Sequence, residues 1–412
     1  MSRLARHWDL DPRTALLNHG SFGATPRAVL RAQTTLRARM ESEPVRFMVE
    51  ELEPLLDRAR AALGAFLNAR PQDLAFVPNA TTAVNAVVNS LALKPGDELL
   101  TVSHAYNACL NALRHAADKA GATVIVAPVE RAPADEHAFE RALLAHATDR
   151  TRLAMVCHVT SPTALVLPIA RTVAALSARG IDTLVDGAHG PGMLDVDLTA
   201  INAAYYTANC HKWICSPKGS AFLHVRADRQ HAIRPAVISH GANSRRSDRS
   251  RFLLEFDWTG TDDPTPRLCI PEALRAMPAI LHGVEPDHLT LDPFSPPPPI
   301  DHQGWTAVRA HNRDLTLKAR RLIAGRLALP LTVPDSMVGS IAAIPLPDGV
   351  GPQPSPNPYP DPIQRRLIDE FGIQVPISHF PAWPQRSIRV SAQLYNDLSQ
   401  YERLADALKG CL

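Results

Sequence analysis

The feature that most constrains the fold is a regular alternation of short apolar runs with alanine-rich stretches between residues 50 and 265. Apolar runs of this length are typical of buried strands, and the stretches between them have the apolar spacing of helices. Strands that alternate with helices form parallel sheets, because each helix carries the chain back to the start of the next strand. The sequence therefore predicts an α/β fold whose large domain contains a mostly parallel sheet.

The expected strands of the large domain occupy residues 74–77, 98–102, 123–126, 153–156 and 183–185, with a further strand at 221–225. The expected helices occupy residues 80–91, 108–120, 138–147 and 169–179. Ligands of open α/β sheets bind at the carboxyl ends of the strands. We therefore expect the functional site in the loops that follow these strands.

A smaller α+β domain is expected after the proline run at 296–299, which is stiff and marks a boundary. Its helices are expected at 305–327, from Asp361 to a stop at Gly372, and from Asn396, with strands at 340–346 and 387–391. The proline-rich segment 349–362 is expected to be an exposed loop. We divide the chain into an N-terminal segment, 1–49, that contributes to the small domain and the mouth of the site, a large domain, 50–294, and the small domain, 295–412.

Charge and cysteine content exclude several classes of function. The chain has 43 Lys and Arg against 41 Asp and Glu, so its formal charge of +2 indicates neither a nucleic-acid nor a membrane partner. The six cysteines contain no CxxC pair, which fits neither a zinc site nor a disulfide framework and is typical of a reducing compartment. There is no signal-peptide pattern and no apolar run long enough to cross a bilayer. We expect a cytoplasmic protein without a metal.

An acid and a lysine are the main candidates for chemistry. Asp186 ends the apolar run 181–185, and Lys212 lies between a histidine and a tryptophan in the segment 209–213. Pyridoxal phosphate (PLP) needs a lysine that holds it as a Schiff base and a carboxylate that keeps its ring nitrogen protonated. The pair therefore predicts PLP as the cofactor. Alone, the Asp-Gly dipeptide is more often a turn, and Lys218 is a competing lysine.

Other loops that follow strands carry polar or aromatic groups. Residues 78–82 (Pro-Asn-Ala-Thr-Thr) open a helix whose free N–H groups would suit a phosphate, although they also read as a plain helix cap. A ring at His104 or Tyr106 could stack on the cofactor or could belong to the core. The turn at 258–261 could reach phosphate or be a simple loop. Arg389 could bind a substrate carboxylate through its two-pronged guanidinium, or point outward from its strand.

Taken together, these motifs resemble those of the isopenicillin N epimerase-like branch of the class V aminotransferases. This superfamily also contains the cysteine desulfurases, and its members are PLP enzymes of fold type I. The resemblance begins at 17–23 (Leu-Asn-His-Gly-Ser-Phe-Gly) and 43–47, and it continues through 79–85, 186–189 (Asp-Gly-Ala-His) and 209–222. It ends at 389–396 (Arg-Val-Ser-Ala-Gln-Leu-Tyr-Asn).

The resemblance implies a role for each candidate residue. Lys212 would carry the cofactor, Asp186 would pair with its ring nitrogen, His189 would contact its phenolic oxygen and Tyr106 would stack on its ring. The phosphate would be held by Ala80, Thr81, Asn209 and His211, with His104 as a further cofactor contact.

The resemblance also implies how substrate and partner subunit meet the site. Arg389 would bind the carboxylate of an amino-acid-type substrate, with Asn18 and Gly20 nearby. Thr261 would come from the partner subunit, so the resemblance implies a homodimer with shared active sites.

Two departures limit what the resemblance implies about the reaction. Asp262 stands where relatives often have arginine, which puts the family's contacts to an acidic substrate arm in doubt. The region 336–381 contains no cysteine, so a desulfurase that forms a persulfide is not expected.

The resemblance implies C–S β-elimination from a cysteine conjugate or epimerisation, in the tailoring of a natural product such as an antibiotic. The alternatives are decarboxylation-linked oxidative deamination or transamination, and a non-catalytic binding protein with the PLP fold. The substrate and the α-carbon bond that breaks are not decided by sequence.

Overall fold

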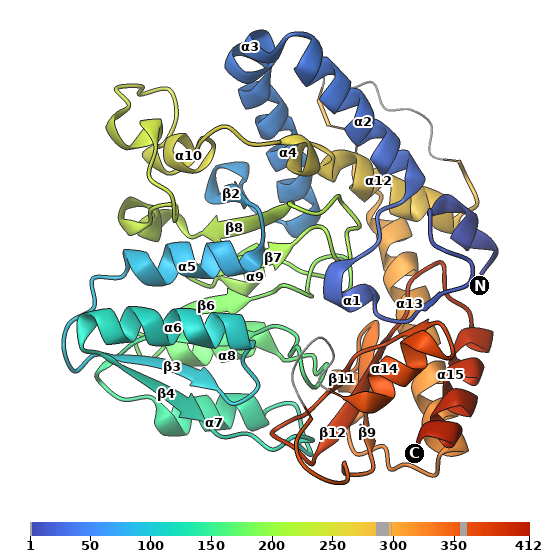
Figure 1. Ribbon diagram of the computed structural model, residues 1–412. Helices are drawn as coiled ribbons and strands as arrows, with labels where there is room; N and C mark the ends of the chain where they lie inside the picture. Colours follow the sequence, from blue (N-terminus) through green and yellow to red (C-terminus); the bar gives the residue numbers. More distant parts are fainter. Residues whose placement is uncertain (1, 286–295, 298, 355–360) are drawn as a thin grey trace.

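A computed structural model describes residues 2–285, 296–297, 299–354 and 361–412. A seven-stranded sheet forms its largest part, with the strand order β2-β8-β7-β6-β5-β3-β4 (Figure 1). These strands are β2 (Leu74–Val77), β3 (Glu98–Val102), β4 (Thr123–Ala127), β5 (Thr151–Cys157), β6 (Asp182–Asp186), β7 (Tyr205–Asn209) and β8 (Ala221–Val225). Only β8 runs antiparallel to its neighbours, β2 and β7, so the predicted mostly parallel sheet is confirmed. Strand β7 was not among the expected strands.

Both faces of this sheet are buried. Along β5, Leu153 and Met155 belong to one apolar cluster, whereas Ala154 and Val156 belong to another. Because successive side chains of a strand point to opposite faces, the two clusters are the cores above and below the sheet. The helices that follow β2, β3, β4 and β5 are α5 (Ala80–Ser90), α6 (Asn107–Ala120), α7 (Ala138–His146) and α8 (Ile169–Ser177), close to their predicted positions.

A second, antiparallel sheet lies towards the C-terminus. It has the order β11-β12-β9 and consists of β9 (Ile341–Leu346), β11 (Ile377–Ser378) and β12 (Arg386–Ser391). Its helices are α13 (His302–Arg326), α14 (Pro362–Asp369) and α15 (Leu398–Cys411). Strand β1 (Ala15–Leu16) pairs in parallel with β10 (Ile373–Gln374), which brings the N-terminal segment beside this part of the chain (Figure 1).

The predicted domain boundaries remain predictions. The boundary at 294/295 lies outside the described residues, and only residues 349–354 and 361–362 of the proline-rich segment are described. The remaining helices are α1 (His19–Phe22), α2 (Arg27–Ser42), α3 (Pro44–Arg46), α4 (Leu52–Leu67), α9 (Leu198–Ile201), α10 (Arg251–Phe256), α11 (Thr265–Leu268) and α12 (Ile270–Leu281). Across the described ranges, we find no helix with the length and apolar character needed to cross a membrane.

The turn that ends α1 is packed directly onto the segment that carries Lys212. Gly23 has a φ of 71° and a ψ of 166°, a conformation that is open essentially to glycine alone. A Cβ atom at Gly23 would lie 1.9 Å from the carbonyl oxygen of His211. A glycine is therefore required where the N-terminal segment meets the lysine segment.

We predict that Gly23→Ala destabilises the protein much more than Gly96→Ala. Gly96 also has a positive φ, of 86°, but a Cβ atom there would meet nothing within 4 Å. Gly96→Ala should therefore lower the free energy of unfolding by about 1 kcal/mol, and Gly23→Ala by about 3 kcal/mol or more, because a backbone clash is added. Urea denaturation measures both values. Equal losses for the two variants would contradict the close packing at Gly23.

Candidate functional site

A cavity of about 370 Å³ lies at the carboxyl ends of the central strands, and we call it the central cavity. Strand β6 ends at Asp186 and β7 ends at Asn209, and both side chains line the cavity. The predicted residues that line it are Gly20, Ala80, Thr81, Tyr106, Asp186, His189, Asn209, His211, Lys212 and Arg389. The fold therefore brings together most of the residues singled out from the sequence.

The side chain of Lys212 lies in the cavity wall and is partly buried. Its amine lies 3.1 Å from Nε2 of His189. Burial, aided by the nearby positive charge of Arg389, lowers the pKa of Lys212 to about 8. A neutral amine is the form that attacks an aldehyde or accepts a proton, so this environment activates Lys212 for both tasks. Lys218, the competing lysine, does not line the central cavity.

Asp186 is a buried carboxylate, and among the described residues it forms no ion pair. Its side chain is 5% exposed, and one oxygen accepts a hydrogen bond from the N–H of Ala188 at 3.1 Å. The thiol of Cys109 lies 3.5 Å from the other oxygen. Burial raises the pKa of Asp186, and within the described residues no ion pair offsets it. A buried charge is costly unless it is paired, so this position fits a cationic ring nitrogen.

His189 is held in one neutral tautomer. The indole N–H of Trp213 donates to Nδ1 of His189 at 3.2 Å, so the ring proton is on Nε2 and faces the cavity. Burial lowers the pKa of His189 well below its ordinary value. His189 can therefore donate a hydrogen bond to an oxygen anion in the cavity, but it cannot serve as a general base.

The N-terminus of α5 forms the end of the cavity that suits a phosphate. Asn79 caps the helix by accepting from the N–H of Thr82 at 2.9 Å, and Asn209 accepts from the N–H of Ala80 at 2.9 Å. The N–H and hydroxyl of Thr81 have no hydrogen-bond partner in the described chain, so they remain for an anion. His211 donates from Nδ1 to the carbonyl of Ser220 at 3.0 Å, which fixes its ring in the wall.

Arg389 lies in the cavity wall and is held by two serines. Its guanidinium donates to the carbonyl oxygen of Ser161 at 2.5 Å and to the hydroxyl of Ser21 at 3.0 Å. The Ser21 hydroxyl in turn donates to Oδ1 of Asn18 at 2.6 Å. Burial lowers the pKa of Arg389 to about 10, which leaves it charged at neutral pH. Asn18 itself lines a neighbouring pocket and not the central cavity.

Two predicted cofactor residues lie elsewhere. His104 is fully buried and is not part of the cavity wall; its Nδ1 lies 2.7 Å from the Thr163 hydroxyl and its Nε2 lies 3.0 Å from the carbonyl of Glu130. These contacts turn its ring into the core, which was the alternative left open for it. Thr261 is exposed on a loop and does not line the cavity of its own chain.

His19 is the main residue that sequence reasoning missed. Its Nε2 donates to the carbonyl oxygen of Lys212 at 2.9 Å, and its Nδ1 therefore accepts from the hydroxyl of Tyr395 at 2.9 Å. Burial lowers the pKa of His19 to about 3, so the ring stays neutral. The motifs at 17–23 and 389–396 contained both residues, but only the folded chain shows that they hold the backbone of Lys212.

Comparison with known proteins identifies the family. The model of the class V aminotransferases matches residues 21–252. The chain is 33% identical to isopenicillin N epimerase of Streptomyces clavuligerus, over 97% of this chain and 95% of the relative. It is 34% identical to the epimerase of Amycolatopsis lactamdurans, over 97% and 96%. The chain belongs to the class V aminotransferases.

More distant relatives of this class V aminotransferase include an L-cysteine desulfhydrase of Arabidopsis thaliana, 25% identical over 96% of this chain and 87% of the relative. Among solved structures, the cystine C–S lyase C-DES in complex with cysteine persulfide has a TM-score of 0.75 at 20% identity, covering 96% of this chain and 97% of the other. The cysteine desulfurase CsdA of Escherichia coli has a TM-score of 0.75 at 19% identity, covering 99% and 97%. These structures show the expected fold type I.

Class V aminotransferases are PLP enzymes that act on amino-acid substrates, so the predicted cofactor is confirmed. The residues of the central cavity fit this cofactor. Asp186 supplies a buried carboxylate, Lys212 supplies an activated amine, and the N-terminus of α5 supplies a place for the phosphate.

We predict that apoprotein forms a Schiff base with PLP faster as the pH rises through about 8, because only neutral Lys212 reacts. Arg389→Gln removes a cation that lowers this pKa, so the midpoint of the rate profile should move to higher pH. Stopped-flow absorbance measures the rates. Arg114→Gln, on the exposed surface of α6, should keep the original midpoint. A wild-type midpoint near that of a free lysine, about 10.4, would contradict the buried amine.

Proposed function

We propose that this enzyme removes the α-proton of an amino-acid substrate and then eliminates a sulfur leaving group from the β-carbon of a cysteine S-conjugate. The main support for this proposal is that the amine of Lys212, whose pKa is lowered by burial, lies in the same cavity as Arg389. A guanidinium binds a carboxylate through two parallel hydrogen bonds. Arg389 would therefore fix the substrate's α-carboxylate while Lys212 accepts the α-proton.

The other cavity residues would hold the cofactor. Asp186 would pair with the ring nitrogen, His189 would donate to the phenolic oxygen, and Tyr106 would lie against the ring. Phosphate contacts are proposed for Ala80, Thr81, Asn209 and His211, and Asn18 and Gly20 are proposed beside the substrate. When bound, PLP makes the bonds at the α-carbon labile by accepting the electrons that they leave behind.

The elimination balances without an oxidant or a reductant. The α-proton moves to the amine of Lys212, the C–S bond breaks, and the sulfur leaves with the bonding electron pair as a thiolate that takes up a proton. Water then releases the remaining carbon skeleton as pyruvate and ammonium. Because the imidazole of His189 is held by Trp213, Lys212 is the better placed base for the first step.

Epimerisation is the second candidate, and it shares the first step. The relatives that are 33% and 34% identical over nearly the whole chain are named isopenicillin N epimerases, which favours it. In that reaction the α-carbon would regain a proton on its other face and no C–S bond would break. Decarboxylation with oxidative deamination, or transamination, would instead release carbon dioxide and an aldehyde, or a 2-oxo acid.

We further propose a homodimer with shared active sites, in which Thr261 reaches the cofactor phosphate of the partner subunit. The exposed position of Thr261, outside the cavity of its own chain, supports this arrangement. The six free cysteines support a reducing, cytoplasmic location. A role in natural-product tailoring is supported by the epimerase relatives. We also propose that the chain divides into an N-terminal segment, 1–49, a large domain, 50–294, and a small domain, 295–412.

We predict that Lys212→Ala abolishes covalent attachment of PLP, whereas Lys218→Ala keeps it. Wild-type protein treated with borohydride should retain a pyridoxyl group on the peptide that contains Lys212. Mass spectrometry of the reduced, digested protein locates the label. A label that persists in Lys212→Ala would show that another lysine carries the cofactor.

We predict that the enzyme releases pyruvate and ammonia in equal amounts from a cysteine S-conjugate, with loss of activity of about a hundredfold or more in Lys212→Ala, the loss expected for removal of a general base. Coupled assays measure both products. Substrate that takes up deuterium at its α-carbon and changes configuration, without pyruvate, would favour epimerisation. Carbon dioxide and an aldehyde would contradict both proposals.

A further inference from the structure

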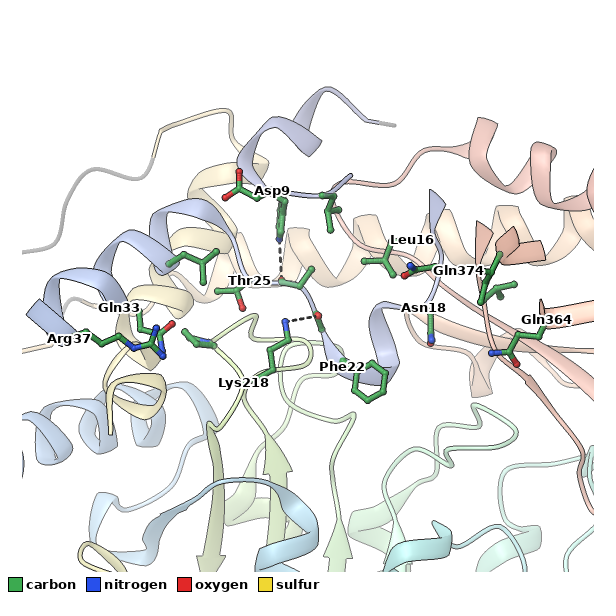
Figure 2. Close-up of a pocket in the computed structure, with 18 residues that line it drawn as sticks. Asp9, Leu16, Asn18, Phe22, Thr25, Gln33, Arg37, Lys218, Gln364 and Gln374 are labelled. Carbon is green, nitrogen blue, oxygen red and sulfur yellow. Dashed lines mark hydrogen bonds between the residues drawn. The ribbon is translucent and has the colours of Figure 1, made fainter. Parts of the chain in front are cut away.

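A second and larger pocket, of about 640 Å³, lies next to the central cavity, and we call it the outer pocket. Figure 2 shows its lining, in which Phe22 lies between Lys218 on one side and Asn18 and Gln364 on the other. Phe22 lines both pockets and is 73% exposed. The two pockets are therefore neighbours that meet at the ring of Phe22.

Of the cations that line the outer pocket, Lys218 has no carboxylate partner among the residues that the structure describes. Within the described residues, Arg37 is paired with Asp263 at 2.8 Å, and Asp9, the carboxylate of the pocket, is paired with Arg27 at 2.5 Å. Lys218 forms no ion pair there, and its amine donates a single hydrogen bond, to the carbonyl of Gly23 at 3.1 Å (Figure 2). An ammonium has three donors, so two donors of Lys218 remain for a ligand.

Two side-chain amides of the outer pocket have their oxygens engaged in hydrogen bonds from protein groups. Oε1 of Gln364 accepts the backbone N–H of Ile377 at 2.9 Å. Oδ1 of Asn18 accepts from Ser21, whose hydroxyl must donate there because it already accepts from Arg389. The amide NH₂ groups of Asn18 and Gln364 have no protein acceptor in the described part of the chain. The pocket therefore offers donors on both sides of Phe22, one of them charged.

The same hydrogen bonds connect the outer pocket to the substrate site. Arg389 reaches the central cavity, Ser21 lies between Arg389 and Asn18, and Asn18 faces the outer pocket. A substrate whose α-carboxylate lies on Arg389 would thus have its side chain directed along this row of residues and past the exposed ring of Phe22. Exposed aromatic rings beside polar groups are typical of ligand-binding surfaces.

We propose that the outer pocket binds the distal arm of the amino-acid substrate and that this arm ends in a carboxylate. The arm lies against Phe22, its carboxylate pairs with Lys218, and Asn18 and Gln364 donate to its polar atoms. This inference rests on the proposed function, and it names the class of substrate: a long cysteine S-conjugate with an anionic end.

The test uses two ligands of equal length that differ in charge, S-(4-carboxybutyl)-L-cysteine and its terminal amide. Holoenzyme is titrated with each ligand, and the change in cofactor absorbance gives the dissociation constant. Pyruvate release is measured separately. We expect the wild type to bind the acid about tenfold or more tightly than the amide, because a charge-assisted hydrogen bond is about twice as strong as a neutral one.

Two variants remove the proposed contacts without removing the structural ones. Lys218→Gln keeps a donor for the carbonyl of Gly23 but loses the charge. Gln364→Glu keeps an oxygen for the N–H of Ile377 but turns the amide donor into an anion. Each should abolish the preference for the acid over the amide. Lys119→Gln, at an exposed lysine of α6, should keep the preference and serves as the charge-matched control.

The outcomes separate the two proposals. A preference for the acid that is lost in both variants, without pyruvate from either ligand, supports the outer pocket and contradicts the elimination. Equal affinity of the wild type for acid and amide overturns the outer-pocket proposal, as does a preference that survives in both variants. Equal affinity together with altered dimer dissociation in Lys218→Gln would make the pocket a subunit contact and would also overturn it.

Discussion

The buried charge of Asp186 is the constraint on which the rest of the site depends. Its carboxylate ends a central strand, is almost fully removed from water and has no ion pair in the described chain. Burial raises the pKa of Asp186, and the nearby charge of Lys212 partly offsets this shift. Burial also lowers the pKa of Lys212, which lines the same cavity. A bound cation beside Asp186 would offset the cost of burying its negative charge. A protonated pyridine ring is such a cation.

The position of Lys212 is fixed by segments that are far apart in the chain. His19 comes from the N-terminal segment and holds the lysine's carbonyl oxygen, while Tyr395 comes from the end of the chain and orients His19. Gly23 allows the same N-terminal turn to lie directly on the backbone of His211. The backbone of Lys212 is therefore held by contacts from both ends of the chain. These contacts explain why motifs at 17–23 and 389–396 accompany a cofactor site in the middle of the sequence.

The sequence predicted most of the strands because their side chains are buried on both faces of the sheet. Such strands appear in the sequence as short apolar runs. It missed β7, since Tyr205–Asn209 mixes aromatic and polar residues and ends in a site residue. It could not give the direction of β8, which depends on pairing with β2 and β7 and not on local pattern.

At the site, residues that follow the strands line one cavity, because parallel strands bring their carboxyl ends to one edge of the sheet. His104 was misplaced because a ring after a strand can turn towards the cavity or the core, and its contact with Thr163 decides for the core.

Asp262, which stands where relatives often have arginine, is paired with a cation close to it in the sequence. Its carboxylate accepts a hydrogen bond from Arg267 at 2.6 Å, and Arg267 is itself largely buried. The next residue, Asp263, is paired with Arg37. The loop that would face a partner subunit thus presents its acids already neutralised, and it offers no uncompensated cation to an acidic substrate arm. In the outer pocket, we assign that role to Lys218, whereas Lys212 lines the central cavity. Recognition of an anionic arm would then come from the chain that carries the catalytic lysine, and would not require the position that the family uses for arginine.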